Sequence, residues 1–305
     1  MSRDIKIDGL KGFLIFCVVL GHMSFYDYGL QLIRMIYSFH MPVFVFLSGY
    51  LTPISPTPEK KNNWLKQTLC IYVIAQLLHT CLKWVLNEPV SLRVLISPAF
   101  TLWYLICLVY WRLSAWTIFK GIPGYWLVTI SFILAFVSGF VPIDQDLSFQ
   151  RAFSFLPFFV LGLVSKKKDI LPSLEKVPIW IAFIFLTLGL FIARHLPTFQ
   201  PKYHYSSLHD IELRLIQVFL GVLLCYSLLR ISRLSVFSFL ARYGRYSLWI
   251  YIGQSFLTRV NVLEKALSHY YGIESNLWIA LTITSLYCIV IGMIADLYYR
   301  NRTTP

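Results

Sequence analysis

The sequence predicts an all-α integral membrane protein with about ten transmembrane helices. Of its 305 residues, 57% are hydrophobic and only 13% are charged, and the mean hydropathy is +0.66, outside the usual range of a soluble globular domain. Apolar runs long enough to cross ~30 Å of hydrocarbon recur along the chain, separated by short polar clusters. These runs are apolar on consecutive residues, whereas the strands of a membrane barrel alternate apolar and polar residues, so we expect helices.

Ten stretches in chain order have the length and composition of spans. The first is interrupted by Lys11 and His22 and is followed by no small-residue cleavage site, so we expect a retained span and not a signal peptide. No extended polar segment interrupts the series, which predicts one membrane domain over residues 1–305. The predicted spans are Leu10–Tyr28, Ile36–Leu51, Thr68–Leu86, Leu95–Trp111, Tyr125–Val141, Phe153–Ser165, Val177–Ala193, Leu213–Leu229, Ser247–Leu263 and Leu277–Tyr299.

The first span carries a lysine near one end and a histidine further in. Lys11 and His22 are eleven residues apart, which on an α-helix returns to within about 20° of the same direction and advances ~16 Å along the axis. Because a bilayer-buried ionisable group is costly, we interpret His22 as functional; a helix-to-helix hydrogen bond is the structural alternative. Burial favours the neutral imidazole, which is the form that a general base requires.

The second span carries His40, Pro42 and the small pair Ser48-Gly49. Counted inward from the outer start of this span, His40 lies at a depth comparable to that of His22, so two antiparallel neighbours would place both imidazoles in one layer. Pro42 frees a backbone carbonyl and bends the helix. Ser48 and Gly49 allow another helix or a ligand to approach the backbone closely.

The distribution of Lys and Arg predicts the orientation. With ten spans, 18 of the 27 basic residues fall on the side of the N-terminus, so we expect both termini in the cytoplasm and a multi-pass protein of the inner (plasma) membrane. This clustering accounts for the net charge of +13 without a nucleic-acid partner. Anionic membrane lipids or an anionic cytosolic substrate are the natural counterparts of the basic face.

The six cysteines stand singly within apolar runs and show no C-x-x-C spacing. We interpret them as small core side chains, and we expect neither a disulfide framework nor a metal site.

Several motifs resemble the signature of acyltransferase family 3, in particular its fucose 4-O-acetylase-like branch. They are Asp8-Gly-Leu-Lys11 with His22, Phe39-His-Met-Pro-Val-Phe-Val-Phe-Leu-Ser48-Gly49, Leu102-Trp-Tyr-Leu105, Phe155-Leu-Pro-Phe-Phe-Val-Leu-Gly162 and Tyr243-Gly-Arg-Tyr-Ser-Leu-Trp-Ile-Tyr251. The resemblance implies an integral membrane enzyme that moves an acyl group, usually acetyl from acetyl-CoA, onto a hydroxyl of a carbohydrate. The acceptor would be a surface polysaccharide, such as an exopolysaccharide or lipopolysaccharide, or a lipid-linked glycan. The positions matching Lys11 and His22 are the essential pair in that family.

The chemistry of this reaction assigns provisional roles to further residues. Coenzyme A carries phosphates at one end and the thioester at the end of a long arm, so a site needs cations at its cytosolic mouth and a base deeper inside. We expect His22 to take the proton of the acceptor hydroxyl, with a transient acyl-imidazole as the second possibility. Ser48, His40 and Tyr104 are candidates to polarise the thioester oxygen. Candidate contacts to the CoA phosphates are Lys11, Lys66, Arg242 and Arg245, with Lys60 and Lys61 nearby.

Two other classes of function share this architecture. A transporter of glycans or small molecules would also place polar residues at mid-depth, although it should show two related halves, and no counterpart of the Phe39–Gly49 stretch is found in the second half. A scaffold without catalysis would not need the geometry of Lys11 and His22. Acyl-CoA hydrolysis or transfer by the purified protein separates the enzyme from both.

Overall fold

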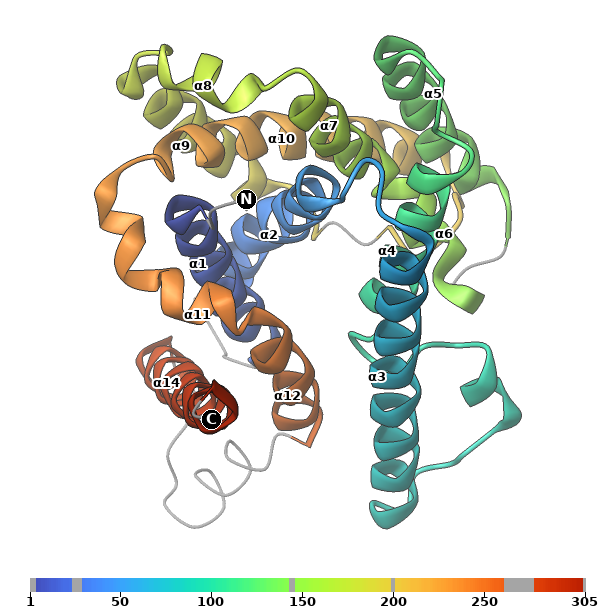
Figure 1. The fold of residues 1–305 in the computed structure, drawn as a ribbon. Coiled ribbons are helices and arrows are strands. Elements are labelled where there is room, and N and C mark those ends of the chain that lie inside the picture. The colour runs from blue at the N-terminus through green and yellow to red at the C-terminus, as the bar shows by residue number, and fades with distance from the viewer. Residues whose placement is uncertain (1–3, 24–28, 143–145, 199–200, 261–276, 304–305) are drawn as a thin grey trace. The chain divides into compact units, whose positions relative to one another are not determined.

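The computed structural model describes residues 4–23, 29–142, 146–198, 201–260 and 277–303, and within these ranges every regular element is a helix. The predicted all-α class is therefore confirmed. The longer helices are α1 (Ile5–His22), α2 (Gly29–Leu51), α3 (Pro58–Val85), α4 (Trp103–Trp116), α5 (Gly124–Val137), α7 (Leu156–Lys167), α9 (Ile179–His195), α10 (Leu208–Ile231), α12 (Ser247–Val260) and α14 (Leu277–Thr303). The short elements are η1 (Leu92–Leu95), η2 (Ser138–Phe140), η3 (Asp146–Ser148), α6 (Phe149–Ser154), α8 (Ile170–Glu175), η4 (Ser235–Leu240) and α11 (Ala241–Arg245) (Figure 1).

Each predicted span overlaps at least one of these helices. Within the described ranges, four helical stretches are long and apolar enough to cross a membrane, namely Leu30–Leu51, Pro58–Val85, Leu208–Ile231 and Leu277–Tyr298. A fifth is formed if Asp146–Ser154 and Leu156–Lys167, which meet at an angle of 55°, count as one bent span. The number of ten spans stays a prediction.

The boundaries differ from the prediction in three places. The second helix begins at Gly29, seven residues before the predicted start, because residues up to Ile36 join the helix without being uniformly apolar. The predicted fourth span begins in η1 and an irregular segment, and α4 starts only at Trp103. The sixth is broken at Phe155, since Pro157 has no N–H for the carbonyl of Phe153 and instead opens α7. Residues 1–3, with Arg3, and the predicted span ends at Tyr28 and Leu263 lie outside the described ranges.

The chain forms two compact units. Unit 1 comprises residues 1–44, 171–199 and 220–305, and unit 2 comprises residues 45–170 and 200–219. The helices α2 and α10 each continue from one unit into the other.

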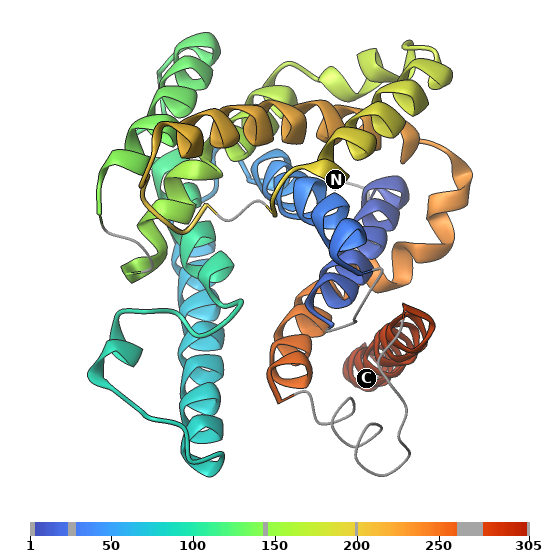
Figure 2. The same cartoon turned by 180° about the vertical axis from the view of Figure 1, so that it is seen from behind.

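In unit 1, α1 packs against η4 and α11 through glycines, and both views show α1 beside α11 (Figures 1 and 2). Gly9 and Gly12 on α1 face the carbonyl oxygens of Phe237 and Leu240, and Gly244 on α11 faces the carbonyl oxygen of Asp8. A Cβ at any of these glycines would overlap a backbone atom. The absence of three side chains therefore allows this close approach and buries most of α1.

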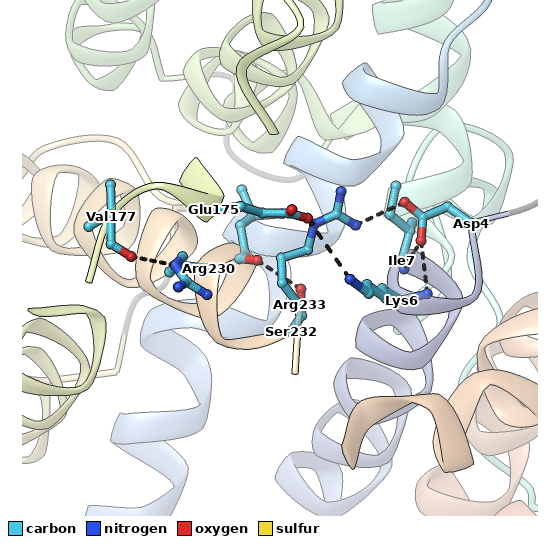
Figure 3. A network of polar contacts seen from close by, with 9 residues as sticks. Asp4, Lys6, Ile7, Glu175, Val177, Arg230, Ser232 and Arg233 are labelled. Carbon is cyan, nitrogen blue, oxygen red and sulfur yellow. Dashed lines mark hydrogen bonds and ion pairs between the residues drawn. The ribbon is translucent and has the colours of Figure 1, made fainter. Parts of the chain in front are cut away.

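Ion pairs join the start of α1 to the end of α8 and to the segment after α10 (Figure 3). Asp4 caps α1 by accepting hydrogen bonds from the backbone N–H of Lys6 and Ile7, and it also pairs with Arg233 at 2.9 Å. Arg233 in turn lies 3.0 Å from the carboxylate of Glu175. Arg233 is thus flanked by two carboxylates.

In unit 2, the last turns of α2 pack against α7 at two glycines. A Cβ on Gly49 would overlap the carbonyl of Phe159, and one on Gly162 would overlap the carbonyl of Phe46. The expected close approach at Ser48-Gly49 is therefore made by a helix of the same chain. Unit 2 also contains a cavity of about 580 Å³ between α4, α5, α6 and α7 with an almost entirely apolar lining.

Candidate active site

Lys11 is in the second turn of α1, and its ammonium pairs with Asp8 one turn earlier. The Lys11 Nζ to Asp8 Oδ1 distance is 3.3 Å, and the two side chains are 20% and 10% exposed. Asp8 belongs to the turn whose carbonyl meets Gly244. The packing of α1 on α11 therefore fixes the position of this ion pair.

His22 is the last residue of α1, whereas the sequence placed it in the middle of a span that continued to Tyr28. The helix ends here because Met23 adopts an extended conformation and its N–H returns to the carbonyl of Leu20. Gly21 allows α2 to come close, since a Cβ there would lie 3.1 Å from Ile36 and 3.3 Å from the ring of Tyr37. The end of α1 is thus set directly against α2.

Tyr37 connects the two histidines that the sequence singled out. Its hydroxyl lies 3.1 Å from Nδ1 of His22, and its ring centroid lies 4.9 Å from that of His40. The prediction that His22 and His40 lie close together is supported within unit 1, where the two imidazoles are near enough for their charges to repel if both were protonated. We call His22, Tyr37 and His40 the imidazole cluster.

The hydrogen bonds of the imidazole cluster determine where protons reside. Nδ1 of His40 lies 2.7 Å from the carbonyl of Ile36, and a carbonyl only accepts, so Nδ1 carries the hydrogen and Nε2 holds the lone pair of the neutral ring. The His22–Tyr37 bond can be donated from either side. Donation by His22 Nδ1 would leave its Nε2 as the accepting nitrogen, which is the arrangement of a general base.

Sequence reasoning missed Tyr37. The signal was available, because Tyr37 precedes His40 by three residues and therefore lies on the same face of a helix. The sequence does not reveal that the hydroxyl reaches across to α1, since that contact depends on the close approach at Gly21.

Ser48 and Tyr104, two further candidates from the sequence, meet each other in unit 2. Their hydroxyl oxygens are 2.6 Å apart, a short hydrogen bond between α2 and α4. Lys66 is exposed on α3 of the same unit. The roles assigned to these residues stay predictions.

Arg242 and Arg245 are exposed on α11 in unit 1. Arg242 forms an ion pair with Asp296 of α14, and Arg245 lies in electrostatic range of Tyr246. A CoA phosphate at Arg242 would have to compete with that carboxylate.

The described part of the chain contains no group of three or more His, Cys, Asp or Glu side chains that could hold a metal ion.

A comparison with protein families decides the identity of the chain. A sequence model of acyltransferase family 3, described as an acyltransferase domain, matches residues 4–297. The chain belongs to this family. The resemblance noted in its motifs is therefore confirmed.

A curated relative of this chain is Nodulation protein NolL of Sinorhizobium fredii. The two are 42% identical over 64 residues, a match that covers 16% of each chain. The chain thus corresponds to about a sixth of the length of that relative. No solved structure matches the sequence.

Proposed function

We propose that this acyltransferase moves an acetyl group from acetyl-CoA to a hydroxyl of a cell-surface or lipid-linked carbohydrate, with His22 as the general base. The observation that carries this proposal is the imidazole cluster, in which Tyr37 hydrogen-bonds His22 and stacks edge-on against His40 at the end of a buried helix. Membership of acyltransferase family 3 supports the reaction class.

The proposed step balances as a direct transfer. Nε2 of His22 takes the proton of the acceptor hydroxyl while its oxygen bonds to the thioester carbonyl carbon. The carbon–sulfur bond then breaks, and the leaving CoA thiolate takes the proton back from the imidazolium. Tyr37 holds the ring of His22 in one orientation, so the reaction does not have to pay the entropy of fixing that ring.

The pairing of the cluster favours one protonated imidazole at a time. A proton on His22 would repel a second one on His40, so the neighbour stays neutral while His22 carries the transferred proton. His40, with Nδ1–H fixed on the carbonyl of Ile36, is then a positioned neutral group beside the base.

Lys11 is proposed to orient the donor. It lies eleven residues before His22 on α1, a separation of ~16 Å along the axis that suits the long arm between the CoA phosphates and the thioester. The ion pair with Asp8 holds its ammonium in place in the absence of donor.

The membrane placement completes the proposal. We propose ten spans with both termini in the cytoplasm, so that acetyl-CoA enters from the cytosolic side, and we place the protein in the plasma membrane.

The test is to express the wild-type chain and His22→Ala in a host strain that lacks it, and to measure the acetyl content of surface and lipid-linked glycans by mass spectrometry. We expect the wild type to raise the acetyl content and His22→Ala to reduce transfer by about 100-fold or more, since a positioned general base contributes roughly 10²–10⁴-fold. Wild-type acetylation by His22→Ala, present in the membrane at the wild-type amount, would disprove the role of His22. Glycans that are unchanged by the wild-type chain would overturn the proposed reaction.

A further inference from the structure

Two cations, Arg112 and Lys166, lie within electrostatic range of each other at one end of unit 2, and no carboxylate of the described residues pairs with either. Arg112 is in the last turns of α4, and Lys166 is in the last turn of α7. Both side chains are partly buried, and the two are close enough for their charges to repel. Among the described residues, no carboxylate oxygen lies within 4.0 Å of either side chain, whereas Lys11, Arg233 and Arg242 of unit 1 each have one.

The guanidinium of Arg112 lies against an aromatic surface. It lies 4.5 Å from the ring centroid of Trp64, whose ring packs edge-on against Trp116 at 5.4 Å. Trp116 is anchored by a 3.0 Å hydrogen bond from its indole N–H to the carbonyl of Pro53. The Nε of Arg112 is buried, and no described residue accepts its hydrogen. A buried donor of a charged group that lacks an acceptor costs free energy unless a ligand supplies one.

The Lys166 ammonium is held by one hydrogen bond, and its other N–H donors are available to a ligand. Its ammonium donates one hydrogen bond of 2.9 Å to the carbonyl of Thr52, in the turn after α2. An ammonium carries three N–H donors, so two are not used by the described part of the chain. Arg112 is also in electrostatic range of the Tyr104 hydroxyl, which bonds Ser48. This end of unit 2 therefore combines the guanidinium of Arg112, the ammonium of Lys166 and the hydroxyls of Tyr104 and Ser48.

Two like charges held near each other in partly buried positions repel, which is unfavourable unless an anion offsets the repulsion. We propose that Arg112 and Lys166 bind a phosphate ester between them. A guanidinium fork matches the oxygens of a phosphate and an ammonium adds a second contact, while Trp64 keeps the fork in place.

Two sources carry this chemistry, namely the phosphates of coenzyme A and the phosphate of an anionic lipid headgroup. The coenzyme A source rests on the proposed function. Lys166 is the first of three consecutive lysines, and the structure distinguishes it from Lys167 and Lys168, which are exposed.

The experiment uses the full-length protein in lipid nanodiscs made of phosphatidylcholine. The affinity for coenzyme A and for dephospho-coenzyme A, which lacks the 3′-phosphate, is measured by calorimetry for the wild type, Arg112→Gln and Lys166→Gln. In a second arm, native mass spectrometry counts the phosphatidylglycerol retained from mixed nanodiscs. The matched controls are Arg93→Gln and Lys168→Gln, which remove the same charges from exposed positions of unit 2.

We expect Arg112→Gln and Lys166→Gln to weaken coenzyme A binding roughly 10- to 100-fold, the effect of removing a charged hydrogen bond, while both controls stay within about twofold of the wild type. A loss confined to phosphatidylglycerol retention would also support the phosphate site and would identify its ligand as a lipid. Wild-type values for both variants in both arms would overturn the inference. Lys166→Gln decides the result if Arg112→Gln fails to fold, and a negative result here leaves the glycan test of His22 standing.

Discussion

At the level of single residues, the imidazole cluster shows what a hydroxyl adds to a pair of histidines. An imidazole at the end of a helix can rotate, and each rotation changes which nitrogen faces the substrate. The 3.1 Å contact with Tyr37 removes that freedom for His22, and the bond to the Ile36 carbonyl removes it for His40. The orientation of both rings thus depends on α2.

We predict that Tyr37→Phe lowers the acetylation rate about three- to tenfold, because it removes one hydrogen bond worth roughly 0.5–1.5 kcal/mol and keeps the ring that packs on His40. The measurement is the rate of glycan acetylation at matched protein levels. Tyr203→Phe is the control, since that residue is 47% exposed. An unchanged rate for Tyr37→Phe would mean that the hydroxyl does not orient His22.

The sequence indicated the ionisable residues of this site, but it did not indicate the contacts between helices that bring them together. His22, His40 and Lys11 are visible as ionisable groups in apolar sequence, and a helical repeat places Lys11 and His22 on one face. The end of α1 at His22 and the contact with Tyr37 follow from the packing of two helices at Gly21, which no local pattern specifies. That no carboxylate of the described residues pairs with Arg112 is a property of the folded chain, which the sequence does not reveal.

At the level of elements, glycines determine which helices touch. α7 contacts the end of α2 at Gly162 and Gly49, where backbone meets backbone. Such contacts tolerate no added atom, because the obstacle is a main-chain carbonyl and not the flexible end of a side chain.

We predict that Gly162→Ala destabilises unit 2 by about 1–3 kcal/mol. Gly124→Ala is the matched control, since a Cβ there would meet only the movable methyl groups of Val164, at 3.2 and 3.4 Å. Thermal unfolding in detergent, followed by tryptophan fluorescence, gives the comparison. Equal stability of the two variants would show that α2 and α7 do not pack through Gly162.

The N-terminal cap of α1 makes a pH-dependent contribution to stability. Burial pushes the pKa of Asp4 upward, but hydrogen bonds from Arg233, Ile7 and Lys6 and the charge of Arg233 outweigh it, so the pKa lies below the ordinary value of 3.8. A depressed carboxyl pKa stabilises the fold above the unfolded-state pKa, and this stabilisation is lost as the pH falls through the folded-state pKa.

We therefore predict that Asp4→Ala lowers the melting temperature at neutral pH, and that its difference from the wild type shrinks as the pH falls below 3.8. Melting curves of both proteins across the acidic range provide the measurement. Glu212→Ala, an exposed carboxylate of unit 2, is the control for general acid effects. A difference that stays constant down to the lowest pH would exclude the Asp4–Arg233 pair as its source.

For the whole molecule, the basic residues and the helix ends suggest the same membrane orientation. In unit 2, four helix ends come together. The end of α4 contacts the turn after α2 through Trp116 and Pro53, and it contacts the start of α3 through Trp64. The end of α7 contacts the turn after α2 through Lys166 and Thr52. These are ends that the positive-inside pattern assigns to the cytoplasm. In unit 1, the start of α1 contacts the end of α8 and the segment after α10, which carry the same assignment. Each unit therefore gathers its predicted cytosolic ends on one side.

The predicted orientation can be tested by cysteine labelling, and the same experiment tests whether acetyl-CoA can reach Arg112 and Lys166 from the cytosol. In a background with all six native cysteines replaced by serine, single cysteines are placed at Lys120, Lys168 and Lys202. We expect an impermeant maleimide to label Lys202→Cys in intact cells, and to label Lys120→Cys and Lys168→Cys only in inverted membrane vesicles. Labelling of Lys168→Cys from outside would place the end of α7, and with it Arg112 and Lys166, on the side where no acetyl-CoA is available, and donor binding there would be impossible.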